Sequence, residues 1–154
     1  MSPRSITDVI QVEAPPLHET TTLADAVRLL LDCDLPALPV LDERERYRGI
    51  FGEREFIGAL FPGYVRTLGY AGFVPRPIED VLEKRREAAG EPVSKHMNTE
   101  HVDVPTDASD TQIAETFLSH RILIVPLTDE GRVVGVITRG AFFRALAERF
   151  TGAR

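Results

Sequence analysis

The residues around Thr138 combine a hydroxyl group, a guanidinium group and an expected helix start, a combination that suits anion binding. Residues 132–138 form a Val- and Ile-rich run that favours a strand, and from Arg139 onward the apolar residues recur three and four apart, as on one helix face. The first N–H groups of a helix lack partners within it, so a strand that turns directly into a helix offers them to a phosphate. The alternative is that Thr138 only ends the strand or caps the helix.

His120 and Arg121 are two further basic groups that could reach a phosphate bound near Thr138. They directly precede residues 122–127, an apolar run that is too short for a typical helix and rich in Ile and Val, so it favours a strand. The alternative is that both side chains stabilise the C-terminus of the helix before them, where positive charge is favoured. The sequence leaves both interpretations open.

No other group of residues predicts a catalytic or metal site. The four histidines do not show the spacing of a zinc site, no nucleophile elbow surrounds a serine, and the glycines form neither a P-loop nor a dinucleotide motif. Cys33 is the single cysteine, and its place at the end of an apolar helix predicts a buried, unreactive thiol. We therefore predict a protein that is not an enzyme, with no cofactor and no metal. An enzyme whose site is not recognisable is the weakest alternative.

The composition of the 154 residues is typical of a globular protein, with 43% hydrophobic and 27% charged residues. The 24 acidic residues exceed the 18 basic ones, and the net charge of −6 argues against general nucleic-acid binding, which needs a basic face. No apolar run is long enough to cross a membrane, and the first ten residues have no apolar core of a signal peptide. We therefore predict a cytoplasmic protein, made of one compact domain or two intimate halves.

The elements expected in residues 5–62 recur in the same order in residues 93–151. Thr22 and Ser109 both begin an amphipathic helix, at an offset of 87 residues. The strand that contains Pro39 recurs at the same offset, and proline predicts an edge or strand-end position for it. Gly49 recurs as Gly135 at an offset of 86, because one residue is missing from the second turn. The shared order of helix, strand, strand and helix predicts a tandem repeat.

Residues 63–92 separate the two repeats. Glycines and prolines break the first half of this insert into turns, and residues 78–89 predict a helix that begins after Pro77. The charged run at residues 83–87 is expected to be a solvated helix face. Whether the insert closes over a binding site is not decided by the sequence.

Both repeats resemble the cystathionine-β-synthase (CBS) domain, and the chain as a whole resembles a CBS pair, or Bateman module. The second repeat carries the pattern in residues 92–97, in Val125-Pro126-Leu127 and in Gly135-Val136-Ile137-Thr138. The first repeat carries it in residues 38–42 and 49–51. The resemblance implies an α/β (α+β) fold, in which each repeat is a small β-sheet flanked by helices. It also implies that the repeats pack pseudo-symmetrically and that two chains form a disc-like homodimer.

The resemblance further implies that clefts between the repeats bind an adenosine-containing ligand such as AMP, ATP or S-adenosylmethionine. In such clefts a Thr or Ser after the glycine strand contacts phosphate, and an acidic residue three positions later holds the ribose hydroxyl groups. Here Thr138 is followed by Ala141 at the acidic position, whereas Gly52 replaces the hydroxyl residue and Glu55 keeps the acid. The resemblance implies ligand contacts at Thr138 and Glu55, and together with the basic groups near Thr138 the candidate ligand-binding residues are Thr138, Arg139, Arg121, His120, Val136 and Glu55.

Each repeat therefore keeps one of the two contacts and loses the other. A charged hydrogen bond contributes about 1.5–3 kcal/mol, so its loss predicts weak nucleotide binding or none. The leading prediction is a non-catalytic regulatory module that senses an adenosine-type ligand. The alternative is a ligand-free scaffold for dimerisation or for interaction with another protein, whose identity the sequence does not give.

Overall fold

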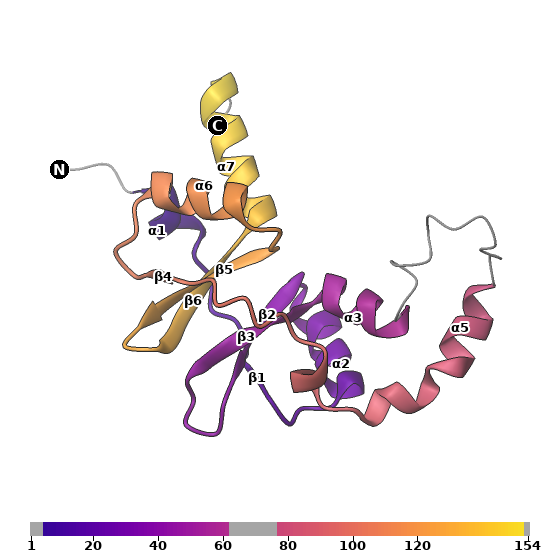
Figure 1. Cartoon of the computed structure of the whole chain (residues 1–154). Helices are drawn as coiled ribbons and strands as arrows, with labels where there is room; N and C mark the ends of the chain where they lie inside the picture. The colour runs from indigo at the N-terminus through magenta and orange to yellow at the C-terminus, as the bar shows by residue number, and fades with distance from the viewer. Residues whose placement is uncertain (1–4, 62–76, 153–154) are drawn as a thin grey trace.

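The computed structural model describes residues 5–61 and 77–152 and shows two halves built from the same elements in the same order (Figure 1). The first half contains β1 (Leu17–His18), α2 (Leu23–Cys33), β2 (Ala37–Leu41), β3 (Tyr47–Gly52) and α3 (Glu53–Leu60). The second half contains β4 (Val104–Pro105), α6 (Asp110–Ser119), β5 (Ile124–Asp129), β6 (Arg132–Thr138) and α7 (Arg139–Thr151). The predicted tandem α/β repeat is therefore confirmed.

Each half forms a three-stranded mixed sheet, with strand orders β1-β2-β3 and β4-β5-β6. The first pair of strands in each sheet is parallel and the second is antiparallel. The helix between the parallel strands begins as predicted, because the hydroxyl groups of Thr22 and Ser109 accept hydrogen bonds from the third amide of α2 and of α6. The two sheets therefore have the same topology and the same helix starts.

Pro39 lies in the middle of the central strand β2, so its predicted edge or strand-end position is wrong. It stands opposite Ile50, but the N–H and C=O groups of Ile50 both bond to Asn98 on the far side of β3. On the other side, the pairing with β1 begins only at Val40. Pro39 has no N–H group to donate, but neither neighbouring strand offers an acceptor at this place, so the sheet loses no hydrogen bond.

The segment that leads into each repeat packs on the opposite half. Helix α1 (Ile6–Ile10) lies beside α6 and α7, and Val12 behind it forms two backbone hydrogen bonds with Val136 of β6, at 3.0 and 2.8 Å (Figure 1). In the same way, Asn98 after the lead-in of the second repeat forms two backbone hydrogen bonds with Ile50 of β3, at 3.0 and 2.8 Å. The two halves are therefore joined by an exchange of segments.

A glycine lies beneath each exchanged segment. A β-carbon at Gly49 would lie 2.5 Å from the backbone oxygen of Asn98, and one at Gly135 would lie 2.5 Å from the side-chain nitrogen of Gln11. These are the two glycines that the repeat analysis matched at an offset of 86 residues. Each glycine lets a segment of the opposite repeat approach the strand closely.

Asp110 holds α1 onto the second half. Its carboxylate accepts hydrogen bonds from the amides of Ile6 and Thr7, both at 2.9 Å, and from the Thr7 hydroxyl group at 2.8 Å. Burial acts to raise the pKa of Asp110, but the hydrogen bonds from Thr7 and Ile6 outweigh it, and the pKa lies below its usual value. The ionised carboxylate is therefore the form that the fold stabilises.

The second half of the insert packs against the first repeat. Helix α5 covers only Ile78–Lys84 and is followed by the 3₁₀ helix η1 (Arg86–Gly90), so the predicted helix over residues 78–89 is too long. The helix ends because Arg85 leaves the helical backbone region, with φ −104° and ψ 11°, and its side chain donates to the carbonyl of Ala59 at the end of α3. The η1 turn then packs against α2.

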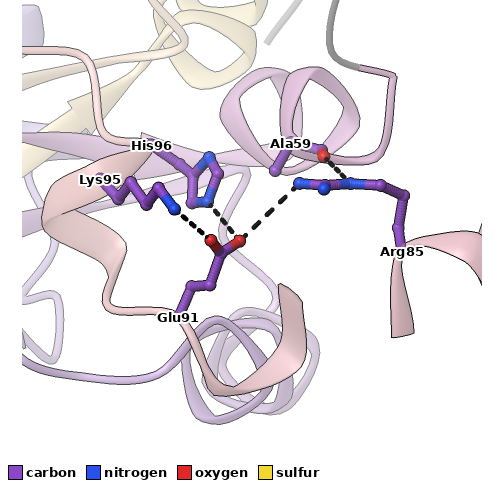
Figure 2. A network of polar contacts seen from close by, with 5 residues as sticks. All are labelled: Ala59, Arg85, Glu91, Lys95 and His96. Atoms are coloured by element: carbon purple, nitrogen blue, oxygen red, sulfur yellow. Dashed lines mark hydrogen bonds and ion pairs between the residues drawn. The ribbon is translucent and has the colours of Figure 1, made fainter. Parts of the chain in front are cut away.

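Glu91 joins this insert to the lead-in of the second repeat, the 3₁₀ helix η2 (Val93–Lys95). Lys95 and His96 approach its carboxylate at 2.5 and 3.1 Å, with Arg85 at 3.7 Å, and Figure 2 shows the three side chains converging on it. Hydrogen bonds from Lys95 and His96 lower the pKa of Glu91, so it is ionised at neutral pH. The cluster fixes η2 against the first half.

Two apolar cores meet between the halves. One contains mainly first-repeat residues together with Ala88 and Val93, and the other contains the second-repeat residues together with Ile6, Ile50 and Tyr47. Cys33 at the end of α2 is half-buried rather than buried, because it lies in the last turn of the helix. Each core therefore contains residues from both repeats.

We expect Gly49→Ala to lower the free energy of unfolding by about 1–3 kcal/mol, because the new methyl group would meet a backbone oxygen that a paired strand holds in place. Gly135→Ala is the matched control: it meets the end of the flexible Gln11 side chain, and its cost should be the smaller of the two. Urea denaturation of both variants checks this. Equal losses would mean that the exchanged segment does not constrain Gly49.

We expect Asp110→Asn to lower the free energy of unfolding by about 1–2 kcal/mol at neutral pH, because the amide keeps one acceptor oxygen but loses the charge. The pKa of Asp110 is lowered in the folded state, so its contribution is complete above the usual value of 3.8 and is lost as the pH falls through the folded value. Urea denaturation at pH 7 and pH 2.5 should show the difference from wild type shrink at low pH. Asp107→Asn, which changes a nearby exposed acid, is the control.

Candidate functional site

A pocket of about 450 Å³ opens between the two halves beside Thr138, and we name it the Thr138 cleft. One wall comes from the chain after α1, one from the link between α2 and β2 with the start of α3, and one from the start of α7. Its volume is within the range of small-molecule sites. The lining residues are Ile10, Val12, Asp34, Leu35, Pro36, Glu53, Leu123, Thr138, Arg139, Gly140 and Ala141.

Thr138 is the last residue of β6 and the N-cap of α7. Its hydroxyl oxygen accepts a hydrogen bond from the amide of Ala141 at 3.1 Å, so its hydrogen is still available to a ligand. The amide of Arg139 donates to the carbonyl of Leu123, whereas the amide of Gly140 has no partner among the residues that the structure describes. The predicted start of a helix with donors for an anion is present, and Thr138 acts as a cap at the same time.

The cleft also contains two acidic residues that the sequence analysis did not select. Asp34 ends α2 in the left-handed backbone conformation, with φ 55°, and Glu53 is the first residue of α3. Both side chains are exposed, and neither carboxylate has a hydrogen bond or ion pair within residues 5–61 and 77–152. The cleft therefore offers donors at α7 and acceptors at the first repeat.

Glu55 caps α3. Its carboxylate accepts a hydrogen bond from the amide of Gly52 at 2.9 Å, and burial raises its pKa against the effect of this bond. Gly52 itself cannot carry a hydroxyl side chain in this backbone, because a β-carbon there would collide with the carbonyl oxygen of Pro36 and with Ala37. The departure of the first repeat from the expected pattern thus has a steric cause.

The remaining predicted residues lie elsewhere. His120 pairs with Glu100 at 2.8 Å, and the carbonyl of Arg121 accepts a hydrogen bond from the Arg54 side chain, which places it beside α3. Val136 is fully buried under Val12. The structure therefore brings Thr138 and Arg139 together in one cleft, whereas Arg121 lies beside Arg54 of α3 and is not among the residues that line this cleft.

Asp34 and Glu53 are the first-repeat equivalents of two residues that the sequence analysis selected. At the offsets of 87 and 86 residues they correspond to Arg121 and Arg139. Glu53 and Arg139, which occupy equivalent positions of the two repeats, line the same cleft, because it lies between the start of α3 and the start of α7. This arrangement follows from the packing of the halves, which the sequence alone does not give.

The described residues contain no group of three or more His, Cys, Asp or Glu side chains placed to hold a metal ion. No helix among residues 5–61 and 77–152 combines the length and apolar character that crossing a bilayer requires. The histidines instead pair with single acids, as His18 does with Glu45 at 2.7 Å.

The sequence of the chain matches the CBS domain family twice, over residues 6–62 and 93–148. The two matches together span more than half of the chain, and they coincide with the two structural repeats. The chain therefore belongs to the CBS domain family. No protein with a curated description matches the sequence.

Solved structures of CBS-pair proteins share the fold. CBSX2 from Arabidopsis thaliana has a TM-score of 0.70 at 18% identity, with 97% of this chain and 99% of that chain covered. A structure of CBSX2 in complex with AMP has a TM-score of 0.66 at 17% identity, covering 95% and 98%. Protein MJ1225 from Methanocaldococcus jannaschii, a suggested archaeal homologue of g-AMPK, has a TM-score of 0.72 at 21% identity, covering 95% and 51%. At these identities the likeness establishes the fold.

Proposed function

We propose that the chain is a non-catalytic regulatory module that binds an adenosine-type ligand in the Thr138 cleft. The observation that carries the proposal is that this cleft is lined by both repeats and contains the free donors at the start of α7. The AMP complex of CBSX2, which has the same fold, supports an adenosine-type ligand over other anions. The Thr138 hydroxyl group and the Arg139 guanidinium group would donate hydrogen bonds to a phosphate of this ligand.

A ligand in this cleft would act on the arrangement of the halves. Val12 and Leu35 both line the cleft, so a ligand that fills the space touches the exchanged N-terminal segment and the first repeat at once. Such a ligand shifts the equilibrium between two arrangements of the halves only if it binds one of them more tightly than the other. The surface presented to another protein would change with it, which is how we expect regulation to occur.

We expect AMP, ADP, ATP or S-adenosylmethionine at millimolar concentration to raise the melting temperature. A ligand at a hundred times its Kd adds about 2.7 kcal/mol to the stability of the folded state. Thr138→Ala should remove most of this shift, measured against its own ligand-free melting temperature because the variant also loses a helix cap worth about 1 kcal/mol. Thr138→Ser should keep both the ligand-induced shift and the helix cap. Thr116→Ala, which removes a threonine hydroxyl group from α6, serves as a control. Absence of a shift with all four ligands would favour the scaffold described next.

The second candidate function, a dimerisation scaffold, is supported by exposed apolar side chains that repeat in the two halves. Leu31 and Leu118 are 77% and 87% exposed at an offset of 87 residues. Ile57 and Phe143 are 56% and 69% exposed at an offset of 86. Single exposed apolar side chains are common, but their recurrence at equivalent positions of both repeats supports a shared contact surface. We propose that a second copy of the chain covers them, because a two-fold dimer would bury the equivalent faces of both halves together.

We expect Phe143→Glu to convert a homodimer into a monomer, because the charge would be buried without a partner at the centre of the contact. Light scattering after size exclusion should show the mass fall from twice 17.1 kDa to 17.1 kDa. Ile78→Glu changes an exposed apolar residue of α5, outside these faces, and should leave the mass unchanged. A wild-type protein that is monomeric at high micromolar concentration would contradict the dimer.

A further inference from the structure

The Thr138 cleft is lined by donors from one repeat and by unpaired acids from the other. Thr138, Arg139 and the amide of Gly140 come from the second repeat, whereas Asp34 and Glu53 come from the first. An ionised carboxylate only accepts hydrogen bonds, so the two acids suit the part of a ligand that carries hydroxyl groups. The donors and the acids thus favour chemically different parts of one ligand.

The acids are held in place by their backbones although their side chains are free. The amide of Glu53 donates to the carbonyl of Pro36 at 2.9 Å, and the amide of Asp34 donates to the carbonyl of Leu30 at 3.2 Å. By contrast, Glu55 is engaged in capping α3, and Ala141 has no acceptor side chain. Glu53 is therefore the acid at this cleft that both starts a helix and remains without a partner among the described residues.

We infer that Glu53 supplies, from the opposite repeat, the acceptor for the sugar hydroxyl groups that Ala141 cannot supply. This inference rests on the proposed function, since it assumes an adenosine-type ligand in the Thr138 cleft. Two adjacent hydroxyl groups donate to the two oxygens of one carboxylate, which gives a charge-assisted contact at two points. Asp34 adds a second negative charge on the same side, at the C-terminal end of α2, where the helix dipole is also negative.

The same acids limit the number of phosphates that the cleft accepts. Asp34 and Glu53 outnumber Arg139, so the ionisable residues that line the cleft carry a net charge of −1. A single phosphate is balanced by Arg139 and the donors of α7, whereas each further phosphate adds negative charge beside unbalanced acids. The ligand is therefore a nucleoside with one phosphate and intact sugar hydroxyl groups, and ADP and ATP bind more weakly.

Titration calorimetry of the full chain with AMP, 2′-deoxy-AMP, ADP and ATP tests this. Wild type should bind AMP more tightly than the other three ligands. Glu53→Gln should lower the affinity for AMP roughly ten- to a hundredfold, because the charged acceptor is lost. The variant should also bind AMP and 2′-deoxy-AMP with equal affinity. Asp34→Asn, a change that the left-handed backbone tolerates, should reduce the difference in affinity between AMP and ATP. Asp32→Asn, the same charge change two residues earlier on α2, should behave as wild type.

The outcomes separate the two levels of the proposal. If wild type binds none of the four ligands, the proposed function fails and the assignment of Glu53 fails with it. If wild type binds AMP and Thr138→Ala does not, but Glu53→Gln binds AMP as wild type does, the site stands and the role of Glu53 is overturned. Tighter binding of ATP than of AMP by wild type would overturn the charge argument in the same way.

Discussion

The exchange of lead-in segments is the constraint on which the rest of the structure depends. Val12 completes the second sheet beside Val136, and Asn98 completes the first beside Ile50. Neither half can leave the other without exposing these strand edges and the apolar residues that the segments carry, such as Ile6 and Val93. Two small sheets that would each be marginal alone therefore become one cooperative unit.

This exchange also explains why the cleft lies between the halves. The chain that follows α1 must cross from the second sheet to β1, and it forms a wall of the Thr138 cleft on its way. Asp110 holds the start of α1, and the pairing of Val12 with Val136 holds the chain that follows it. A ligand in the cleft thus contacts the segment that joins the two halves, which is the physical basis for coupling binding to their arrangement.

The repeated order of elements was predictable from sequence, because helix caps such as Thr22 and Ser109 and the spacing of apolar residues are local signals. The exchange was not, because nothing local in Asn98 or Val12 indicates a partner in the opposite repeat. Pro39 shows the same limit: its central position is possible only because Ile50 bonds to Asn98 instead. For the site, Thr138 was found from the strand-to-helix change, whereas Asp34 and Glu53 required knowledge of how the halves face each other.

The starts of α7 and α3 carry different residues because each helix is capped in a different way. At α7, the hydroxyl group of Thr138 reaches the amide of Ala141, so the helix needs no acid at that position. At α3, the strand end approaches Pro36 and Ala37 too closely for any side chain, and Gly52 cannot cap. Glu55 therefore reaches back to the amide of Gly52. The acid that survives in the first repeat is thus accounted for by the stability of α3, and any acid that serves a ligand in the Thr138 cleft has to come from across it.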